Sequence, residues 1–192
     1  MAVDVLPQTD PLKEAYGPFK DEMTFEDFKT KVDALDIKKW HFVRASFLYQ
    51  QALKCQECNP NVAMLLLCSC AETMQLLEGG KPRKNFMKFY EDYCPNNLRK
   101  PPIQYYSNLK PPLNLIDASF NEALDYIYAK FRCLYVHEGV GHLELPPKDF
   151  HLVGDQLLDK FKDKIYVIDK LAILRWFVSI TKECLSKILN SF

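Results

Sequence analysis

Val-Ala-Met-Leu-Leu-Leu-Cys-Ser-Cys, residues 62–70, is the stretch that decides the fold of this chain. Its apolar side chains cover most of the circumference of a helix, and such a helix belongs in the interior of a protein. Asn59-Pro60 precedes the stretch and Gly79-Gly80 follows it, so we expect a central, buried helix at 61–78. Glu72 interrupts its apolar run.

Apolar periodicity and capping residues predict further helices on both sides of this one. We expect them at 25–35 after Thr24, and at 37–54, 82–93, 117–136 and 169–189. Between 150 and 167 the pattern allows a short hairpin, 151–153 with 165–167, or a short helix at 156–161, and we favour the hairpin. The sequence therefore predicts an all-α helical bundle with a small β-hairpin before the last helix.

Length and composition are those of one globular domain. The 192 residues are 48% hydrophobic, enough for a core, and the net charge is zero. Prolines and a glycine predict a loose N-terminal arm at 1–23, ahead of a single domain at 24–192. The first ten residues lack the pattern of a signal peptide and no apolar run is long enough to span a bilayer, so we expect a soluble, cytoplasmic protein without a membrane partner. The seven cysteines are an odd number, which favours reduced thiols over a disulfide framework.

The stretch Arg132-Cys133-Leu134-Tyr135-Val136-His137-Glu138-Gly139 ends the predicted 117–136 helix. Gly139 is suited to a left-handed helix cap. A permanent cation and an imidazole that exchanges a proton near neutral pH are together suited to cleaving a phosphodiester. Arg132 and His137 are therefore the candidate catalytic residues.

The R-x4-H spacing of Arg132 and His137, with Glu138-Gly139 after it, resembles the signature of HEPN domains. The earlier segment Cys70-Ala71-Glu72-Thr73-Met74-Gln75-Leu76-Leu77 resembles the alanine-glutamate helix of the Apea-like HEPN branch. The two matches bracket about residues 37–190. The resemblance implies an all-α bundle that dimerises and, in many members, acts as a metal-independent endoribonuclease.

The spacing of the two candidate residues bears on the oligomeric state. On one continuous α-helix, five residues separate Arg132 and His137 by about 140°. Either the last turn unwinds, or two copies pair. The resemblance implies a homodimer in which both residues of each subunit meet across a two-fold axis. His137 would then act as general base or acid, and Arg132 would hold the scissile phosphate.

A structural role for the same residues is the alternative. An isolated carboxylate is costly to bury, so we expect Glu72 to be buried and paired with a cation of the 117–136 helix, namely Arg132. Arg132 could also pair with Asp125, and His137 could cap carbonyls at the helix end. Cys133 departs from the family pattern, because active members often carry a polar residue directly after the arginine.

A basic segment favours RNA as the partner. Residues 81–110 contain seven basic side chains but only two acidic ones. Cations beside exposed aromatic rings are what single-stranded RNA binds, although a solvated basic face would have the same composition. The candidate RNA-binding residues are Lys81, Arg83, Lys84, Lys88, Arg99, Lys100, Tyr105, Tyr106 and Lys110.

The cysteines do not predict a metal site. Cys55 and Cys58, with Cys68 and Cys70, have the number of thiolates that zinc takes. However, Cys68 and Cys70 lie about 200° apart on a helix and point to opposite sides. We therefore expect no metal and no other cofactor.

Two functions remain open. The leading hypothesis is a HEPN-type endoribonuclease or RNA-binding protein, homodimeric, with Arg132 and His137 at the dimer cleft. The alternative is a non-catalytic HEPN-like helical module that binds a protein or a small ligand. Convergence of two Arg132–His137 pairs in one groove would distinguish the first from the second.

Overall fold

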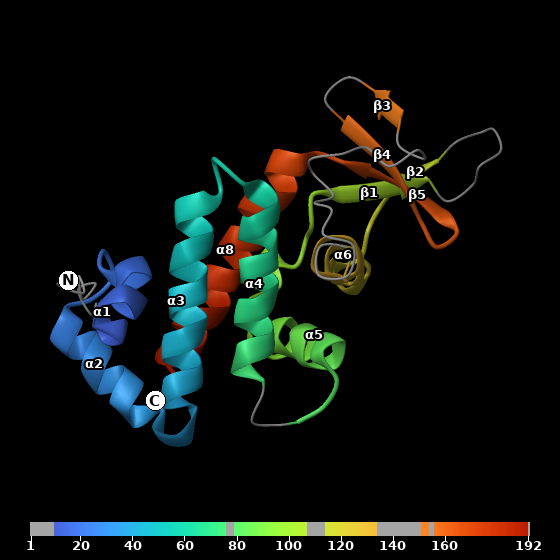
Figure 1. The fold of residues 1–192 in the computed structure, drawn as a ribbon. Coiled ribbons are helices and arrows are strands. Elements are labelled where there is room, and N and C mark those ends of the chain that lie inside the picture. The colour runs from blue at the N-terminus through green and yellow to red at the C-terminus, as the bar shows by residue number, and fades with distance from the viewer. Residues whose placement is uncertain (1–9, 76–78, 107–113, 134–150, 154–155, 192) are drawn as a thin grey trace, which may run out of the picture.

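The computed structural model of this chain describes residues 10–75, 79–106, 114–133, 151–153 and 156–191. Most of them are helical, which confirms the predicted fold class in its main feature (Figure 1). Helices α3 (Lys39–Cys55), α4 (Pro60–Met74) and α8 (Lys170–Leu189) pack together in the middle of the molecule. An antiparallel sheet lies at one end, beyond α6 (Phe120–Ile127).

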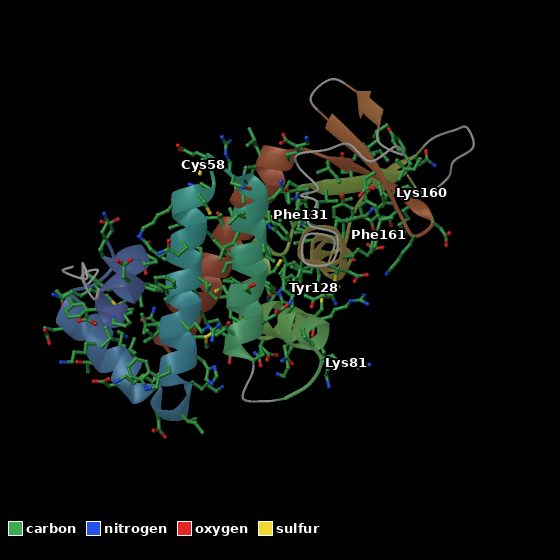
Figure 2. The ribbon with its side chains drawn as sticks, viewed as in Figure 1. Cys58, Lys81, Tyr128, Phe131, Lys160 and Phe161 are labelled. Carbon is green, nitrogen blue, oxygen red and sulfur yellow. The ribbon has the colours of Figure 1, made fainter. Side chains whose placement is uncertain are left out.

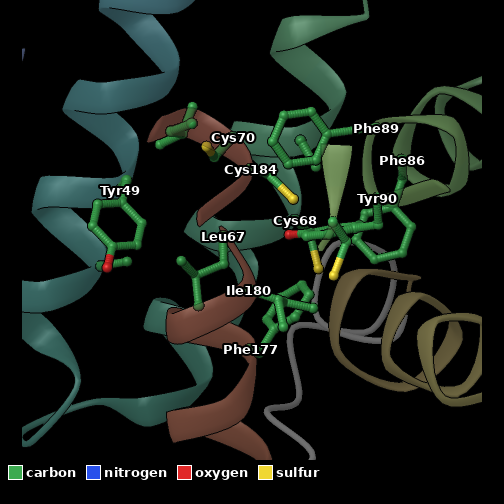
Figure 3. Close-up of a cluster of buried hydrophobic side chains, with 14 of the residues drawn as sticks. Tyr49, Leu67, Cys68, Cys70, Phe86, Phe89, Tyr90, Phe177, Ile180 and Cys184 are labelled. Carbon is green, nitrogen blue, oxygen red and sulfur yellow. The ribbon is translucent and has the colours of Figure 1, made fainter. Parts of the chain in front are cut away.

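Helix α4 is the central helix, as its sequence predicts. Asn59 caps it by accepting a hydrogen bond from the backbone N–H of Val62 at 3.1 Å, and Pro60 occupies its first turn, where a missing N–H costs nothing. Leu67 is fully buried, whereas Leu65 and Leu66 are half-buried. The core around α4 is aromatic and rich in sulfur, and Figure 3 shows Tyr49, Leu67, Cys68, Cys70, Phe86, Phe89, Tyr90, Phe177, Ile180 and Cys184.

Helices α5 and α8 also match the sequence closely. Helix α5 (Pro82–Tyr93) has the predicted limits, and α8 begins after Asp169, whose carboxylate accepts from the backbone N–H of Ala172. The two helices are joined in the core by a hydrogen bond of 2.8 Å between the hydroxyls of Tyr90 and Thr181. This bond satisfies two buried polar atoms that would otherwise destabilise the core.

The N-terminal segment differs from its prediction. Residues Pro11–Tyr16 form helix α1, and a short 3₁₀ turn continues to Phe19, which is fully buried. The ring of Phe19 lies 5.5 Å from that of Phe28 in α2 (Phe25–Ala34) and 6.0 Å from that of Phe42 in α3. The expectation of a loose arm is therefore wrong for these residues. Pro11, taken as a sign of irregular chain, occupies the first position of a helix.

The sheet is larger than the predicted hairpin. Its five strands have the order β2-β1-β5-β4-β3, and every neighbouring pair is antiparallel. The strands are β1 (Ile103–Tyr106), β2 (Leu115–Asp117), β3 (His151–Val153), β4 (Gln156–Phe161) and β5 (Lys164–Ile168).

Two expectations for this region are wrong. Strand β1 lies between the predicted helices at 82–93 and 117–136, where no helix or strand was predicted, and 156–161 is a strand that separates the two halves of the expected hairpin. Strand β1 pairs with β5, which lies about 60 residues further along the chain. A strand that is stabilised by such a distant partner need not show a strand pattern in its own sequence. Ile103 is buried and Tyr105 packs on Tyr166, with ring centroids 5.6 Å apart.

The predicted 117–136 helix divides into two parts. Ser119 and Glu122 form a capping box at the start of α6, and the α-helix ends at Ile127. A π-helical segment follows at Tyr128–Cys133. Positions 134–136 of the predicted helix lie outside the described residues.

Candidate functional site

Arg132 lies on the π-helical segment and points at α4. Its Nε donates to Oε1 of Glu72 at 3.0 Å, and its Nη2 donates to Oε2 at 3.4 Å. The pairing of Glu72 with Arg132 that the sequence predicts is confirmed. Both side chains are only partly buried, with 22% of Arg132 and 15% of Glu72 exposed, so the pair lies at the edge of the core.

Tyr128 lies beside this carboxylate. Burial raises the pKa of the Tyr128 hydroxyl well above its usual value, and the neighbouring charge of Glu72 adds to this shift. Tyr128 precedes Arg132 by four positions on a segment whose hydrogen bonds run from residue i to i+5, so both side chains reach one face. Figure 2 shows Tyr128 and Phe131 on this segment, next to α4. Tyr128 was not among the residues predicted from the sequence, although its spacing from Arg132 is a usable signal.

The ion pair keeps Arg132 charged in a partly apolar place. Burial lowers the pKa of the Arg132 guanidinium, but the hydrogen bonds and the charge of Glu72 outweigh this effect and raise it overall. Burial also raises the pKa of the neighbouring Cys68 thiol well above its ordinary value, and the charge of Glu72 adds to that shift. Cys68 is therefore a neutral thiol beside the pair.

His137 lies outside the described residues, and so does Lys110. The convergence of Arg132 and His137 in one groove therefore stays a prediction.

Asp125, the other acidic partner considered for Arg132, binds Arg83 of α5 and, at 2.6 Å, Lys162.

The start of α5 carries a basic surface made of Lys81, Arg83, Lys84 and Lys88. The first three side chains belong to exposed residues, and the four line a surface hollow of about 460 Å³ together with Met87 and Glu91. Arg83 forms an ion pair with Asp125, and Lys88 forms one with Asp92. Lys81 and Lys84 take part in no ion pair with any residue that the structure describes. They are the cations of this surface best able to bind an external anion.

Arg99, Lys100 and Tyr105, three of the other candidate RNA-binding residues, have partners within the protein. Arg99 donates to the backbone carbonyls of Cys94 and Glu91, at 3.2 and 2.6 Å, and so caps the far end of α5. Lys100 lies 3.9 Å from Asp117, and Tyr105 packs on the sheet. Tyr106 is half-buried at the end of β1. The structure therefore does not bring these four residues into the basic surface.

The basic surface and the Glu72–Arg132 pair are neighbours. Buried Phe86 of α5 packs on Tyr128 with ring centroids 5.0 Å apart, and Tyr128 lies beside the charge of Glu72. The Arg83–Asp125 ion pair joins the same helix to α6. Helix α5 is thus connected to the pair through the core, and Figure 2 shows Lys81 at the start of this helix.

No group of three or more His, Cys, Asp or Glu side chains among the described residues is placed to hold a metal ion. Cys58 is exposed, whereas Cys68 and Cys70 are buried on α4. None of the described helices is both long enough and apolar enough to cross a bilayer.

We compared the chain with protein-family models, with curated proteins and with solved structures, and none of the three comparisons gave a match.

Proposed function

We propose that this chain is a HEPN-type domain that binds RNA and cleaves it as a homodimer, without a metal ion, using Arg132 and His137. The observation that carries the proposal is the position of Arg132. A partly exposed guanidinium on the π-helical segment is fixed by Glu72, and buried aromatic packing between Tyr128 and Phe86 connects this segment to α5, the helix that carries the basic surface.

The ion pair with Glu72 is compatible with phosphate binding. A guanidinium has five N–H donors in a rigid plane, more than one carboxylate can accept. The carboxylate fixes the orientation of the plane, and preorganised donors are what stabilise charge that develops on a phosphate. In this proposal Arg132 holds the scissile phosphate, and Lys81 and Lys84 bind neighbouring phosphates of the strand.

His137 supplies the proton transfer in the proposed reaction. The imidazole takes the proton of the ribose 2′-hydroxyl, whose oxygen attacks the adjacent phosphorus to form a 2′,3′-cyclic phosphate, while the 5′-oxygen leaves and takes up a proton from water. The nucleophile belongs to the substrate, so the reaction needs RNA and needs no metal-bound water. This chemistry follows from the residue types and from the HEPN resemblance.

A non-catalytic helical module that binds a protein or a small ligand is the second candidate. Two observations favour it. Arg132 already has a structural role, because it neutralises the only described acidic side chain of α4, and the position after it is Cys133. In this alternative the pair holds α4 against the end of α6 and performs no chemistry.

Cleavage of a labelled single-stranded RNA in EDTA tests the proposal. We expect wild type to cut the RNA and to leave a DNA of the same sequence intact, while His137→Ala and Arg132→Ala lose cleavage. Equal residual cleavage by wild type and both variants would show contamination and would leave the non-catalytic module as the function.

Binding is tested separately with a double variant. Lys81→Ala with Lys84→Ala removes two cations from the α5 surface, and Lys20→Ala with Lys29→Ala removes two exposed cations from the α1–α2 region as a matched control. We expect only the first pair to weaken RNA binding and to reduce its salt dependence, by about one unit of slope per lost phosphate contact. Equal affinity of both double variants would exclude this surface as the RNA site.

A further inference from the structure

The turn between α3 and α4 carries two thiols that the proposed nuclease does not use. Cys55 is the last residue of α3, and Cys58 directly precedes Asn59, which caps α4. Among the described residues Cys58 is the one exposed cysteine, whereas Cys55 is half-buried and packs partly on the core. Figure 2 shows Cys58 at this turn. An exposed thiol thus lies three positions along the chain from a sheltered one.

A hydrogen bond closes this turn and holds the two cysteines close together. The backbone N–H of Asn59 donates to the carbonyl of Cys55 at 2.7 Å, and the Cys58 thiol donates to the same carbonyl, with 3.5 Å between sulfur and oxygen. Residues 55–59 therefore form one helical turn, in which the Cα atoms of positions i and i+3 lie about 5 Å apart. A disulfide joins residues whose Cα atoms are about 4.4–6.8 Å apart. The backbone is thus already spaced for a bond between Cys55 and Cys58.

Formation of the bond requires a local movement of the turn. The two Cβ atoms, about 5–6 Å apart on a helical turn, must approach each other to about 4 Å. Cys58 can make this movement because it lies outside both helices, and the chain leaves the helical conformation at Asn59, whose φ is −147°. The thiols of Cys55 and Cys58 then give up weak S–H hydrogen bonds to the carbonyls of Gln51 and Cys55, at 3.1 and 3.5 Å.

The pair is better suited to oxidation than to metal binding. Two thiolates are half of a structural zinc site, and no third His, Cys, Asp or Glu among the described residues joins them. The two thiols also differ in reactivity. Burial raises the pKa of the Cys55 thiol, and the neighbouring Cys58 thiol raises it further. Cys55 is therefore a neutral thiol near pH 7, and the exposed Cys58 reacts first.

We propose that Cys55 and Cys58 form a redox site, at which a small disulfide of the glutathione class oxidises the two thiols reversibly to a protein disulfide. The Cys58 thiolate attacks one sulfur of the oxidant, the S–S bond of the oxidant breaks, and one glutathione leaves. Cys55 then loses its proton, and its sulfur attacks that of Cys58, which forms the protein disulfide and releases the second glutathione. Two electrons pass from the cysteines to the oxidant, and their two protons end on the two glutathione thiols.

This redox site goes beyond the proposed nuclease and is separate from it. It directly precedes α4, whereas Glu72, which binds Arg132, lies near the other end of that helix. A reversible disulfide is also compatible with seven cysteines that are all free in the structure. The folded turn already holds Cys55 close to Cys58, so oxidation should stabilise the fold by restricting the unfolded chain more than the folded one.

Thiol trapping on the folded full chain tests the proposal. The protein is treated with glutathione disulfide, its remaining thiols are alkylated in denaturant, and tryptic fragments are weighed by mass spectrometry. The fragment 55–83 contains Cys55, Cys58, Cys68 and Cys70. In wild type we expect two of these thiols to escape alkylation and to become reactive again after dithiothreitol. Cys55→Ser should stop with one glutathione bound to Cys58, and Cys58→Ser should keep all its remaining thiols free.

Cys133→Ser is the matched control, because Cys133 is half-buried like Cys55 but lies outside the turn. This variant should form the disulfide at 55–58 as wild type does. The proposal would be overturned by a wild type that keeps all the thiols of the fragment or that stops at the mixed disulfide with glutathione. Loss of two thiols in Cys58→Ser would overturn it as well, since the bond would then join other cysteines.

Urea denaturation gives a second measurement, which reports on the geometry of the folded turn. We expect the oxidised chain to unfold at a higher urea concentration than the reduced chain. Cys58→Ser treated with the same oxidant should show no shift. An equal or lower midpoint after oxidation would mean that the folded turn does not favour the disulfide, which contradicts the proposal. RNA cleavage by the Arg132 and His137 variants tests the nuclease independently of either result.

Discussion

Arg132 and Glu72 lie 60 positions apart in the sequence and form a two-bond ion pair that holds the π-helical segment after α6 against α4, with 3.0 Å between Nε and Oε1. Arg132→Ala should lower the free energy of unfolding by about 1.5–3 kcal/mol, the usual range for hydrogen bonds to a charged group. Arg132→Lys should recover only part of it, because an ammonium cannot form the paired bonds of a guanidinium. Urea denaturation measures both.

A double-mutant cycle separates the pair from its surroundings. Glu72→Gln removes the charge at nearly constant shape, and the double variant Glu72→Gln/Arg132→Ala should be more stable than the sum of the single effects predicts. Additive effects would mean that the two side chains contribute independently. His137→Ala is a useful comparison, because we expect it to lose cleavage with little change in stability.

The packing of α4 makes a second prediction. Leu67 is fully buried, so Leu67→Ala should cost about 2–5 kcal/mol. Leu66, the preceding residue, is half-buried, so Leu66→Ala should lower the free energy of unfolding clearly less than Leu67→Ala does. Chemical denaturation of the two variants compares the two faces of one helix. Equal losses would contradict the orientation of α4 in the structure.

Local sequence signals predicted the helices because helices are stabilised by local contacts. The limits of α5 and the caps of α2 and α8, at Thr24 and Asp169, follow from residues within a few positions of each end. The Glu72–Arg132 pair was also predictable, because a carboxylate on the most apolar helix needs a cation, and few were available.

The sheet and the π-helical segment were not predictable in the same way. Strand β1 pairs with β5 across most of the C-terminal half of the chain, and hydrophobic periodicity does not report such a partner. After α6 the backbone hydrogen bonds change from α-helical to π-helical, but the amino-acid composition of the segment does not mark this change. For the candidate site, this means that the sequence predicted Arg132 and Glu72 but not Tyr128.

The junction of sheet and helix provides a third prediction. Asp159 of β4 is 1% exposed, and it accepts from the hydroxyl of Tyr126 at 2.6 Å and from Nζ of Lys130 at 3.0 Å. Asp159→Ala should destabilise the protein by about 3–5 kcal/mol, because it removes a buried carboxylate from a partly buried ammonium. Tyr126→Phe removes one bond and should cost about 1.5–3 kcal/mol. If Tyr126→Phe were the more damaging change, the carboxylate would not be the centre of this junction.

The last prediction concerns pH and the start of α6. Glu122 binds Lys164 of β5, and its Oε2 accepts from the backbone N–H and the hydroxyl of Ser119 at 2.9 and 2.8 Å. The hydrogen bond from Lys164 is the largest effect on Glu122, and together with the two bonds from Ser119 it outweighs burial and lowers the pKa of Glu122 to about 2. Because the folded pKa lies below that of the unfolded chain, the charged carboxylate stabilises the fold fully above about pH 4.5. This contribution is lost as pH falls toward 2.

Glu122→Gln isolates that charge, since glutamine also serves in a capping box. Wild type should be more stable than Glu122→Gln at neutral pH, and the difference should shrink steadily as the pH is lowered from 4.5. Urea midpoints at several pH values between 7 and 3 measure this difference. Glu122 is about one-third exposed, so its contribution is reduced by solvent and salt, and added salt should also narrow the gap. A difference that is independent of both pH and salt would show that Glu122 acts through packing and not through its charge.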